Sequence, residues 1–220
     1  MSQLIFKFPF KTKFYEQDYY VSKNNFSTYK LIETWPDWPG NWLNIFGPEG
    51  CGKTHLSNIL KKKINKSVIL DANNINDDDL LNFDKLDCII IDNYKFNINE
   101  ELFYTFLNHS KQCNNYIVVN SLKPIKDMQF KLKDLKSRAN SFVSLGIDLP
   151  TDELLRVIIS KSFSEKQLDI NPKVSEYIIK NIDRSYEKVF KFIKEIDDLS
   201  LSSGKSININ LIKKVLSNNE

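Results

Sequence analysis

The residues best placed to do chemistry lie in one short stretch near the end of the first quarter of the chain. That stretch reads Gly47, Pro48, Glu49, Gly50, Cys51, Gly52, Lys53 and Thr54. It has the form G-x-x-x-x-G-K-[ST], the pattern of a phosphate-binding loop, or P-loop. In this pattern the glycines let consecutive backbone N–H groups turn inward around an anion. The lysine reaches the outer phosphates, and the threonine hydroxyl holds Mg²⁺ that bridges them.

The flanking sequence favours this interpretation over a glycine-rich turn that matches by chance. Residues 42–46 (WLNIF) form an apolar run typical of a buried strand. Residues 54–64 predict a helix with Leu56, Leu60 and Ile64 on one face. A P-loop requires a strand before it and a helix after it, so that the phosphates lie at a helix N-terminus, where the backbone favours negative charge.

A second candidate is Asp92, near the end of the continuous apolar strand predicted at 88–93. An acid at the carboxyl end of a strand downstream of a P-loop suits the Mg²⁺ shell, and an ordinary strand-ending aspartate is the alternative. Many P-loop ATPases place a second acid at the next position to orient the attacking water. Here that position is Asn93, which cannot accept a proton, so we expect weak intrinsic ATP hydrolysis.

Three further features each allow two interpretations. Asn120 and Ser121 end the predicted strand 116–121. One interpretation is that they hydrogen-bond a γ-phosphate or a water, and the other is that they are only a polar strand end. The aromatic residues at 35–40 (WPDWPG) either line an adenine pocket or belong to the hydrophobic core. The first ten residues, MSQLIFKFPF, dock on a partner or form an edge strand.

Composition limits the class of protein. Of the 220 residues, 41% are apolar, which is enough for a core in one large domain or in a domain plus a small one. The net charge of +3 does not indicate a nucleic-acid-binding protein. The three cysteines show no metal-binding spacing and read as free thiols in a reducing cytosol. No signal peptide or membrane-spanning run is visible.

The order of predicted elements indicates an α/β fold with a parallel sheet and helices on both faces. Strands are expected at 42–46, 67–71, 88–93, 116–121 and 141–145, with a polar loop at 73–79. Ligand should therefore bind beyond the carboxyl ends of the strands. After a boundary at 150–153 the pattern is helical only. Helices are expected at 154–163, from Pro172, from 183 or 185 through Leu199, and at 211–216.

Four segments, GPEGCGKTHL, IIIDN, DLKSRA and DRSYEKVFKFI, resemble the DnaA family of AAA+ ATPases, and most of all its Hda group of DnaA-homologous regulators. The resemblance covers essentially the whole chain. It implies an N-terminal clamp-binding peptide at 1–12 and an AAA+ P-loop domain with a five-stranded parallel sheet at 13–150. A small all-helical lid domain is implied at 151–220.

The resemblance also implies roles for single residues. Lys53, Thr54 and Asp92 keep their P-loop ATPase roles, with Thr54 and Asp92 as the Mg²⁺ ligands. The peptide that resembles a sliding-clamp-binding motif contains Gln3, Leu4, Phe6 and Phe8. The nucleotide-binding set extends to Tyr20, Val21, Asn25 and His55.

Three later residues match functional positions of the family. Ser121 occupies the first sensor position, where the initiator has aspartate. Arg138 matches the arginine that acts as a finger on a neighbour's nucleotide, and its alternative is a structural ion pair with Asp134 one turn earlier. Arg184 matches the second-sensor arginine. It is expected at the very start of a helix, where the dipole disfavours a cation unless an anion is near or the end is solvated.

The function implied is that of a cytoplasmic, nucleoid-associated regulator that binds ADP or ATP with Mg²⁺. It would dock on the DNA-loaded polymerase sliding clamp and stimulate hydrolysis of DnaA-bound ATP through Arg138, which prevents re-initiation. A homodimer is allowed, DNA contact is expected only through the clamp, and no membrane partner is expected. The alternatives are a DnaA-like initiator or loader paralogue that acts directly on DNA, and an autonomous ATPase or kinase. Initiators continue after the lid into a helix-turn-helix, whereas this chain ends at Glu220.

Overall fold

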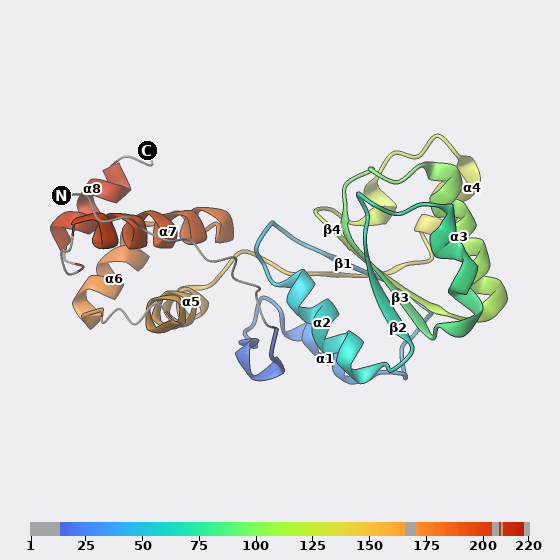
Figure 1. The fold of residues 1–220 in the computed structure, drawn as a ribbon, viewed down its shortest axis with the longest axis horizontal. Helices are drawn as coiled ribbons and strands as arrows, with labels where there is room; N and C mark the ends of the chain where they lie inside the picture. Colours follow the sequence, from blue (N-terminus) through green and yellow to red (C-terminus); the bar gives the residue numbers. More distant parts are fainter. Residues whose placement is uncertain (1–13, 166–169, 204–206, 208, 218–220) are drawn as a thin grey trace. The chain divides into compact units, whose positions relative to one another are not determined.

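The computed structural model describes residues 14–165, 170–203, 207 and 209–217. These residues divide between two compact units, Phe14–Asp148 and Leu149–Glu220 (Figure 1). The predicted clamp-binding residues Gln3, Leu4, Phe6 and Phe8 lie outside the described residues.

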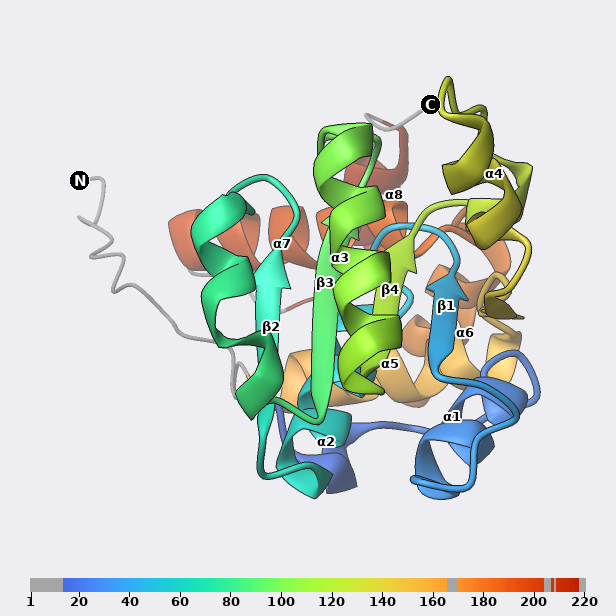
Figure 2. The same cartoon turned by 90° about the vertical axis from the view of Figure 1, so that its right-hand side faces the viewer.

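The first unit is built on a sheet of five parallel strands. These are β1 (Trp42–Phe46), β2 (Ser67–Asp71), β3 (Cys88–Tyr94), β4 (Tyr116–Ser121) and β5 (Val143–Gly146). Their order across the sheet is β2-β3-β4-β1-β5, and every pairing is parallel (Figure 2). The α/β fold with five parallel strands that the sequence predicts is therefore confirmed.

Helices cover both faces of the sheet. Helices α1 (Phe26–Glu33) and α2 (Lys53–Lys63) lie on one face, whereas α3 (Glu100–Cys113) and α4 (Lys133–Ala139) lie on the other (Figures 1 and 2). A strand covered on both faces must be apolar throughout, and Ile89, Ile90 and Ile91 are each at most 1% exposed.

The two faces have different cores. On the face of α3, strand residues pack against Phe103, Phe106 and Leu107, all at most 1% exposed. On the other face, α2 buries Leu56 and Leu60 completely. The spacing of these side chains is the one expected for helices that bury one stripe.

Two predicted boundaries need correction. The segment expected as a polar loop through residue 79 contains the start of a 3-10 helix, η2 (Asp77–Lys85), because Asn76 and Asp79 cap it reciprocally. The strand expected from residue 141 begins at Val143, because the backbone N–H groups of residues 141 and 142 donate to carbonyls of the last turn of α4. Two further 3-10 turns, η1 (Glu16–Asp18) and η3 (Ile125–Asp127), complete this unit.

The second unit is helical, as expected. It contains α5 (Asp152–Glu165), α6 (Pro172–Asn181), α7 (Tyr186–Ser203) and α8 (Ile209–Ser217). Asn171 caps α6 by accepting a hydrogen bond of 2.9 Å from the Lys173 amide, and Pro172 occupies the first helical position. Helix α7 begins at Tyr186, so Arg184 precedes this helix and does not start it. None of the described helices is long and apolar enough to cross a membrane.

Glu100 joins the first turns of α3 and α4. Its carboxylate accepts hydrogen bonds of 2.9 Å from the backbone amides of Lys131 and Leu132, and Leu132 is the N-cap residue of α4. The bond from Leu132, followed by the one from Lys131, holds the pKa of Glu100 below its ordinary value. A side chain from α3 thus satisfies amide groups that the start of α4 would leave without partners.

We expect Glu100→Gln to lower the melting temperature at pH 7, because an amide accepts backbone hydrogen bonds less strongly than a carboxylate. The folded pKa of Glu100 lies below the ordinary value of 4.5. Its contribution is therefore complete above pH 4.5 and is lost as the pH falls through the folded pKa. The difference in melting temperature between wild type and variant should be present at pH 7 and shrink as the pH falls below 4.5.

The neighbouring Glu101→Gln is the matched control, because its carboxylate makes no hydrogen bond in the described part of the chain. Thermal melts followed by circular dichroism measure both variants. Equal and pH-independent shifts for the two variants would contradict the bridging role of Glu100.

Candidate nucleotide-binding site

The P-loop connects β1 to α2 and has the backbone shape that its glycines permit. Gly47, Gly50 and Gly52 have φ values of 157°, 78° and 98°. A Cβ atom at Gly52 would lie 3.0 Å from the ring of Tyr19, and one at Gly47 would lie 2.6 Å from the Ile147 carbonyl oxygen. Because a side chain would be strained and crowded at both positions, the loop requires glycine there.

Lys53 begins α2 and folds back over the loop. Its Nζ atom donates to the carbonyl oxygens of Gly47 at 2.7 Å and Pro48 at 2.9 Å. Cys51 Sγ lies 3.6 Å from the same ammonium. Burial raises the pKa of the Cys51 thiol, and the nearby positive charge offsets this effect only in part. Cys51 is thus a neutral residue that packs within the loop, and Lys53 carries the positive charge of the loop.

Thr54 and Asp92, the two predicted Mg²⁺ ligands, lie side by side. The hydroxyl of Thr54 donates to Asp92 Oδ2 at 2.7 Å. The other carboxylate oxygen accepts from the amide side chain of Asn120 at 2.9 Å and from the backbone amide of Asn93 at 3.0 Å. The carboxyl end of β3 therefore holds a carboxylate, 6% exposed, beside the hydroxyl of the P-loop helix.

Asn120 joins this site in a way that sequence reasoning only partly anticipated. Its side chain is fully buried and also donates to Ser57 Oγ of α2 at 2.7 Å. Its carbonyl oxygen is buried without a hydrogen-bond partner. A buried acceptor left open beside a carboxylate fits a site for a hydrated cation, since such groups are normally paired. Among the described residues no cluster of three His, Cys, Asp or Glu could hold a metal.

Ser121 belongs to the opposite face of β4. Its hydroxyl accepts from Asn44 Nδ2 at 2.9 Å and donates to the Lys123 carbonyl at 2.6 Å. Neighbouring residues of a strand point to opposite faces, and this alternation could have separated Asn120 from Ser121 in advance. The sensor role of Ser121 stays a prediction.

Asn93 is turned toward β2. It has a φ of 60°, a conformation in which asparagine is common, and its Nδ2 donates to Asp71 Oδ2 at 3.0 Å. Asp71 also accepts two hydrogen bonds from Asn73. The backbone bond from Asn73, with help from the Asn93 and Asn73 side chains, holds the pKa of Asp71 below its ordinary value. The carboxylate that lies next to Asn93 is therefore a poor proton acceptor.

The predicted adenine-side residues form a turn in front of α1. Asn25 accepts from the Ser22 amide at 2.8 Å and donates to the Tyr20 carbonyl at 3.0 Å. Tyr20 is 37% exposed, and Val21 is half-buried. The residue that contacts the P-loop is instead the neighbouring Tyr19.

His55 lies in an aromatic cluster beside the loop. Its Nε2 atom is 2.7 Å from the Tyr15 carbonyl oxygen. Its ring meets the rings of Phe14 and Tyr19 edge-on at centroid distances of 5.2 Å and 5.3 Å. Tyr19 also stacks on Tyr29 of α1 at 5.8 Å. Tyr19 was not among the predicted nucleotide-binding residues, although it stands in the same aromatic segment as Tyr20.

Glu49 is an exposed residue of the loop, and its carboxylate pairs with Lys95 Nζ at 2.5 Å. The hydrogen bond from Lys95 lowers the pKa of Glu49. Both side chains are more than half exposed, so the pair contributes little to stability. It nevertheless connects the P-loop to the segment that follows β3.

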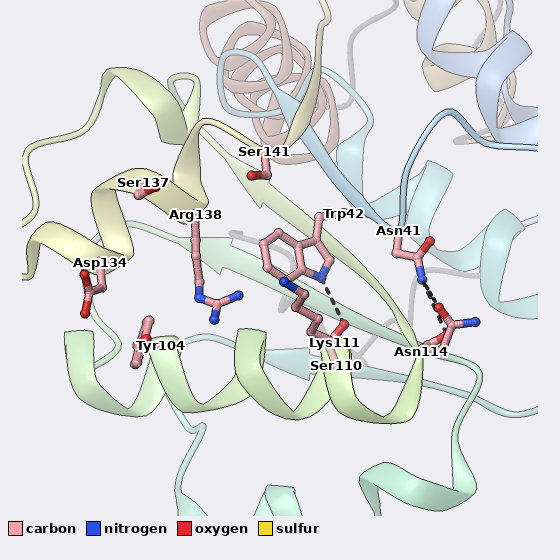
Figure 3. Close-up of a pocket in the computed structure, with 10 residues that line it drawn as sticks. All are labelled: Asn41, Trp42, Tyr104, Ser110, Lys111, Asn114, Asp134, Ser137, Arg138 and Ser141. Atoms are coloured by element: carbon pink, nitrogen blue, oxygen red, sulfur yellow. Dashed lines mark hydrogen bonds between the residues drawn. The ribbon is translucent and has the colours of Figure 1, made fainter.

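Arg138 lies far from the P-loop of its own chain. Its guanidinium carbon is 5.7 Å from the centre of the Trp42 ring and 5.1 Å from that of Tyr104 (Figure 3). Trp42 begins β1, whereas the P-loop begins after β1 ends, about 16 Å away for five residues at about 3.3 Å each. The predicted alternative, an ion pair with Asp134, is not formed, because no ion pair within 4.0 Å involves Arg138 in the described part of the chain.

Arg184 is held within the helical unit. Its Nη2 atom lies 2.9 Å from Asp152 Oδ1 at the start of α5. The Arg184 side chain is 63% exposed. An exposed pair of this kind is worth about 0–1 kcal/mol, so it would yield readily to a more highly charged partner.

Asn120→Ala should lower the free energy of unfolding by about 1–3 kcal/mol, because buried Asp92 and Ser57 would lose a donor. Urea denaturation measures this change. Asn108→Ala on α3 is the control, since Asn108 is only half-buried and its side chain makes no hydrogen bond among the described residues. Equal stability of Asn120→Ala and wild type would show that this amide does not hold the carboxylate.

Comparison with known proteins supports the AAA+ fold. The chain is similar to domain III of the replication initiation protein DnaA from Thermotoga maritima, with 18% identity and a TM-score of 0.76 over 96% of this chain and 98% of that one. It is also similar to AMPPCP-bound DnaA from Aquifex aeolicus, with 18% identity and a TM-score of 0.67 over 88% of this chain and 68% of that one.

A more distant match has another cellular role. The RuvB Holliday junction branch migration motor of Thermotoga maritima is 19% identical with a TM-score of 0.61, over 81% of this chain and 61% of that one. Similarity to both an initiator and a branch migration motor shows the fold alone. The helical unit gives a more specific resemblance.

Residues 152–216 match the family described as "Hda, lid domain". These residues include the four described helices of the second unit, up to the last turn of α8. The chain therefore has the AAA+ fold of DnaA domain III followed by a helical lid of the Hda type, and it resembles the DnaA-related AAA+ proteins, Hda among them.

Proposed function

We propose that this protein regulates replication initiation by stimulating hydrolysis of the ATP that DnaA carries. The observation that carries the proposal is the pairing of an Hda-type lid with a DnaA-type nucleotide domain. A DnaA-like initiator or loader that acts directly on DNA shares the nucleotide domain, so the lid match is what favours a regulator.

Adenine nucleotide is the proposed ligand of the P-loop, as ADP or ATP with Mg²⁺. Lys53 would exchange its loop carbonyls for phosphate oxygens, and the start of α2 would supply unpaired backbone N–H groups. Thr54 and Asp92 would hold Mg²⁺, which supplies charge neutralisation to the phosphates. Support comes from the AMPPCP that a similar DnaA binds. Asn93, which cannot accept a proton, and Asp71, which already accepts hydrogen bonds from Asn73 and Asn93, favour weak intrinsic hydrolysis.

Arg138 is the proposed trans-acting group. Its position at the amino end of β1 leaves it unable to reach its own P-loop, and its guanidinium is only partly buried. A guanidinium stays charged at all relevant pH values and can form two parallel hydrogen bonds to phosphate oxygens. It would stabilise the charge that develops on the γ-phosphate of DnaA-bound ATP.

Two parts of the proposal rest on sequence resemblance. Residues 1–12, with Gln3, Leu4, Phe6 and Phe8, are proposed to dock on the sliding clamp and bring the protein to DNA-loaded replication complexes. Residues 13–150 would form the nucleotide domain and 151–220 the lid. Arg184 would then give up its exposed pair with Asp152 to contact the phosphates as a second sensor.

Lys53→Ala should weaken binding of Mg²⁺-ADP at least tenfold, because a charged hydrogen-bond donor is worth roughly 1.5–3 kcal/mol. Isothermal titration calorimetry measures the affinity. Lys61→Ala is the control, since Lys61 lies exposed on the same helix and its side chain makes no hydrogen bond or ion pair in the described part of the chain. Unchanged affinity of Lys53→Ala would remove the nucleotide site from the proposal.

The decisive experiment follows turnover of radiolabelled ATP on DnaA, with and without this protein and DNA-loaded clamp. We expect strong stimulation only when both are present. Arg138→Ala should keep the fold and bind ADP and clamp as wild type does, yet lose most of the stimulation, since arginine fingers contribute roughly 10³–10⁵ in rate. Stimulation by Arg138→Ala at the wild-type rate would refute this mechanism. Tight binding to DNA without clamp would favour the initiator or loader alternative.

A further inference from the structure

We propose that Arg138 does not act alone, and that the pocket around it is a two-cation receptor in which Lys111 is the second phosphate-binding group. The ligand would be the triphosphate of a nucleotide held by a second AAA+ subunit. This inference rests on the proposed function and adds a residue to it.

The pocket lies where several strands begin. It is lined by Asn41 and Trp42 at the start of β1, by Lys111 in the last turn of α3, by Arg138 in the last turn of α4, and by Ser141 between α4 and β5. Its volume is about 590 Å³. The P-loop occupies the other end of β1, so this pocket is separate from the nucleotide site of its own chain.

The charges in the pocket are unbalanced. Lys111 and Arg138 enter it from α3 and α4, whereas the carboxylate of Asp134, the acid among its lining residues, is turned away from the guanidinium (Figure 3). Neither cation forms an ion pair within 4.0 Å in the described ranges of the chain. Two like charges in one hollow repel each other, and an anion bound between them would remove this cost.

Two aromatic rings of the pocket walls, those of Trp42 and Tyr104, lie close to the guanidinium. Trp42 is 9% exposed, and its indole N–H donates to Ser110 Oγ at 3.0 Å, which fixes the plane of the ring. Ser110 in turn donates to the Asn115 carbonyl at 2.7 Å. The Arg138 side chain donates no hydrogen bond among the described residues, so its N–H groups are available for an anion.

A second cation suits the reaction. In phosphoryl transfer the negative charge spreads over several phosphate oxygens, so two positive groups placed before the reaction can stabilise it better than one. Lys111 supplies a compact charge on a flexible stem, and Arg138 supplies a rigid fork. The opposite wall of the pocket is also fixed in position. Asn41 donates to Asn114 Oδ1 at 2.9 Å and thereby joins the end of α3 to the start of β1.

A simpler role for Lys111 predicts a different result. It lies in the last turn of α3, where any lysine favours the negative end of the helix dipole. In that case Lys111→Ala would slightly lower the melting temperature and leave catalysis on the partner unchanged.

The test measures DnaA-bound ATP hydrolysis over a range of concentrations of this protein with loaded clamp, which separates the maximal rate from the half-saturating concentration. We expect Lys111→Ala to lower the maximal rate roughly tenfold, the loss typical of one charge-assisted hydrogen bond, with little change in half-saturation. Lys111→Arg should restore most of the rate. Lys136→Ala on α4 is the control, because Lys136 is exposed and does not line the pocket.

The outcomes separate the two proposals. If wild type stimulates and Arg138→Ala does not, but Lys111→Ala reaches the wild-type maximal rate, the proposed function stands and the two-cation receptor is refuted. A change in half-saturation alone would make Lys111 a docking charge and would also refute it. If wild type itself fails to stimulate, the proposed function fails and this inference fails with it.

Discussion

The parallel pairing of β1 with β4 on one side and β5 on the other is the constraint on which both ends of the nucleotide unit depend. The ladder continues into the P-loop itself, because the Gly47 amide donates to the Ser121 carbonyl at 3.2 Å and the Ile147 amide donates to the Phe46 carbonyl at 2.8 Å. The first residue of the loop is therefore held by the sheet. At the opposite end, the same strand positions Trp42 under Arg138. One rigid element thus separates the nucleotide site from the proposed trans-acting group by the length of a strand.

Asp92 and Asp71 lie at the carboxyl ends of neighbouring strands, but their hydrogen-bond partners differ. Asp92 is buried, and its donors are a hydroxyl, a side-chain amide and a backbone amide. This arrangement keeps a carboxylate in place for a cation without a permanent charged partner. Asp71, at the end of the neighbouring β2, is instead surrounded by asparagine donors. This difference fits the proposed regulator, in which nucleotide and Mg²⁺ would bind beside Asp92 and ATP hydrolysis would occur on another subunit.

Helix α3 links features that lie far apart in the sequence. Its first residue, Glu100, holds the start of α4, and its last turn carries Ser110 and Lys111 beside Trp42. The helix that bears Arg138 is therefore attached at its start to α3 through a carboxylate and at its end to an aromatic wall that α3 also supports. In this arrangement, small changes in α3 would alter the position of the guanidinium directly.

The sequence by itself determined the P-loop, the five strands, the helical second unit and the position of Asp92 in β3, because these depend on local patterns. A glycine-rich loop between an apolar strand and a helix has few alternative structures, and continuous apolar runs specify strands covered on both faces. Strand β5 begins two residues after its predicted start. The 3-10 helix η2 was missed because a capping box in a polar segment is easily read as a loop.

Only the tertiary structure decided which side chains meet. The sequence places Asn120 and Ser121 together, but the alternation of β4 sends one to Asp92 and the other to Asn44. It places Asp134 one turn from Arg138, yet the guanidinium packs on Trp42 and Tyr104, residues distant in the chain. Tyr19, Asp71, Glu100 and Lys111 gain their importance in the same way. Long-range contacts are set by the packing of helices on a sheet whose strand order differs from the order of the chain, and no local pattern encodes them.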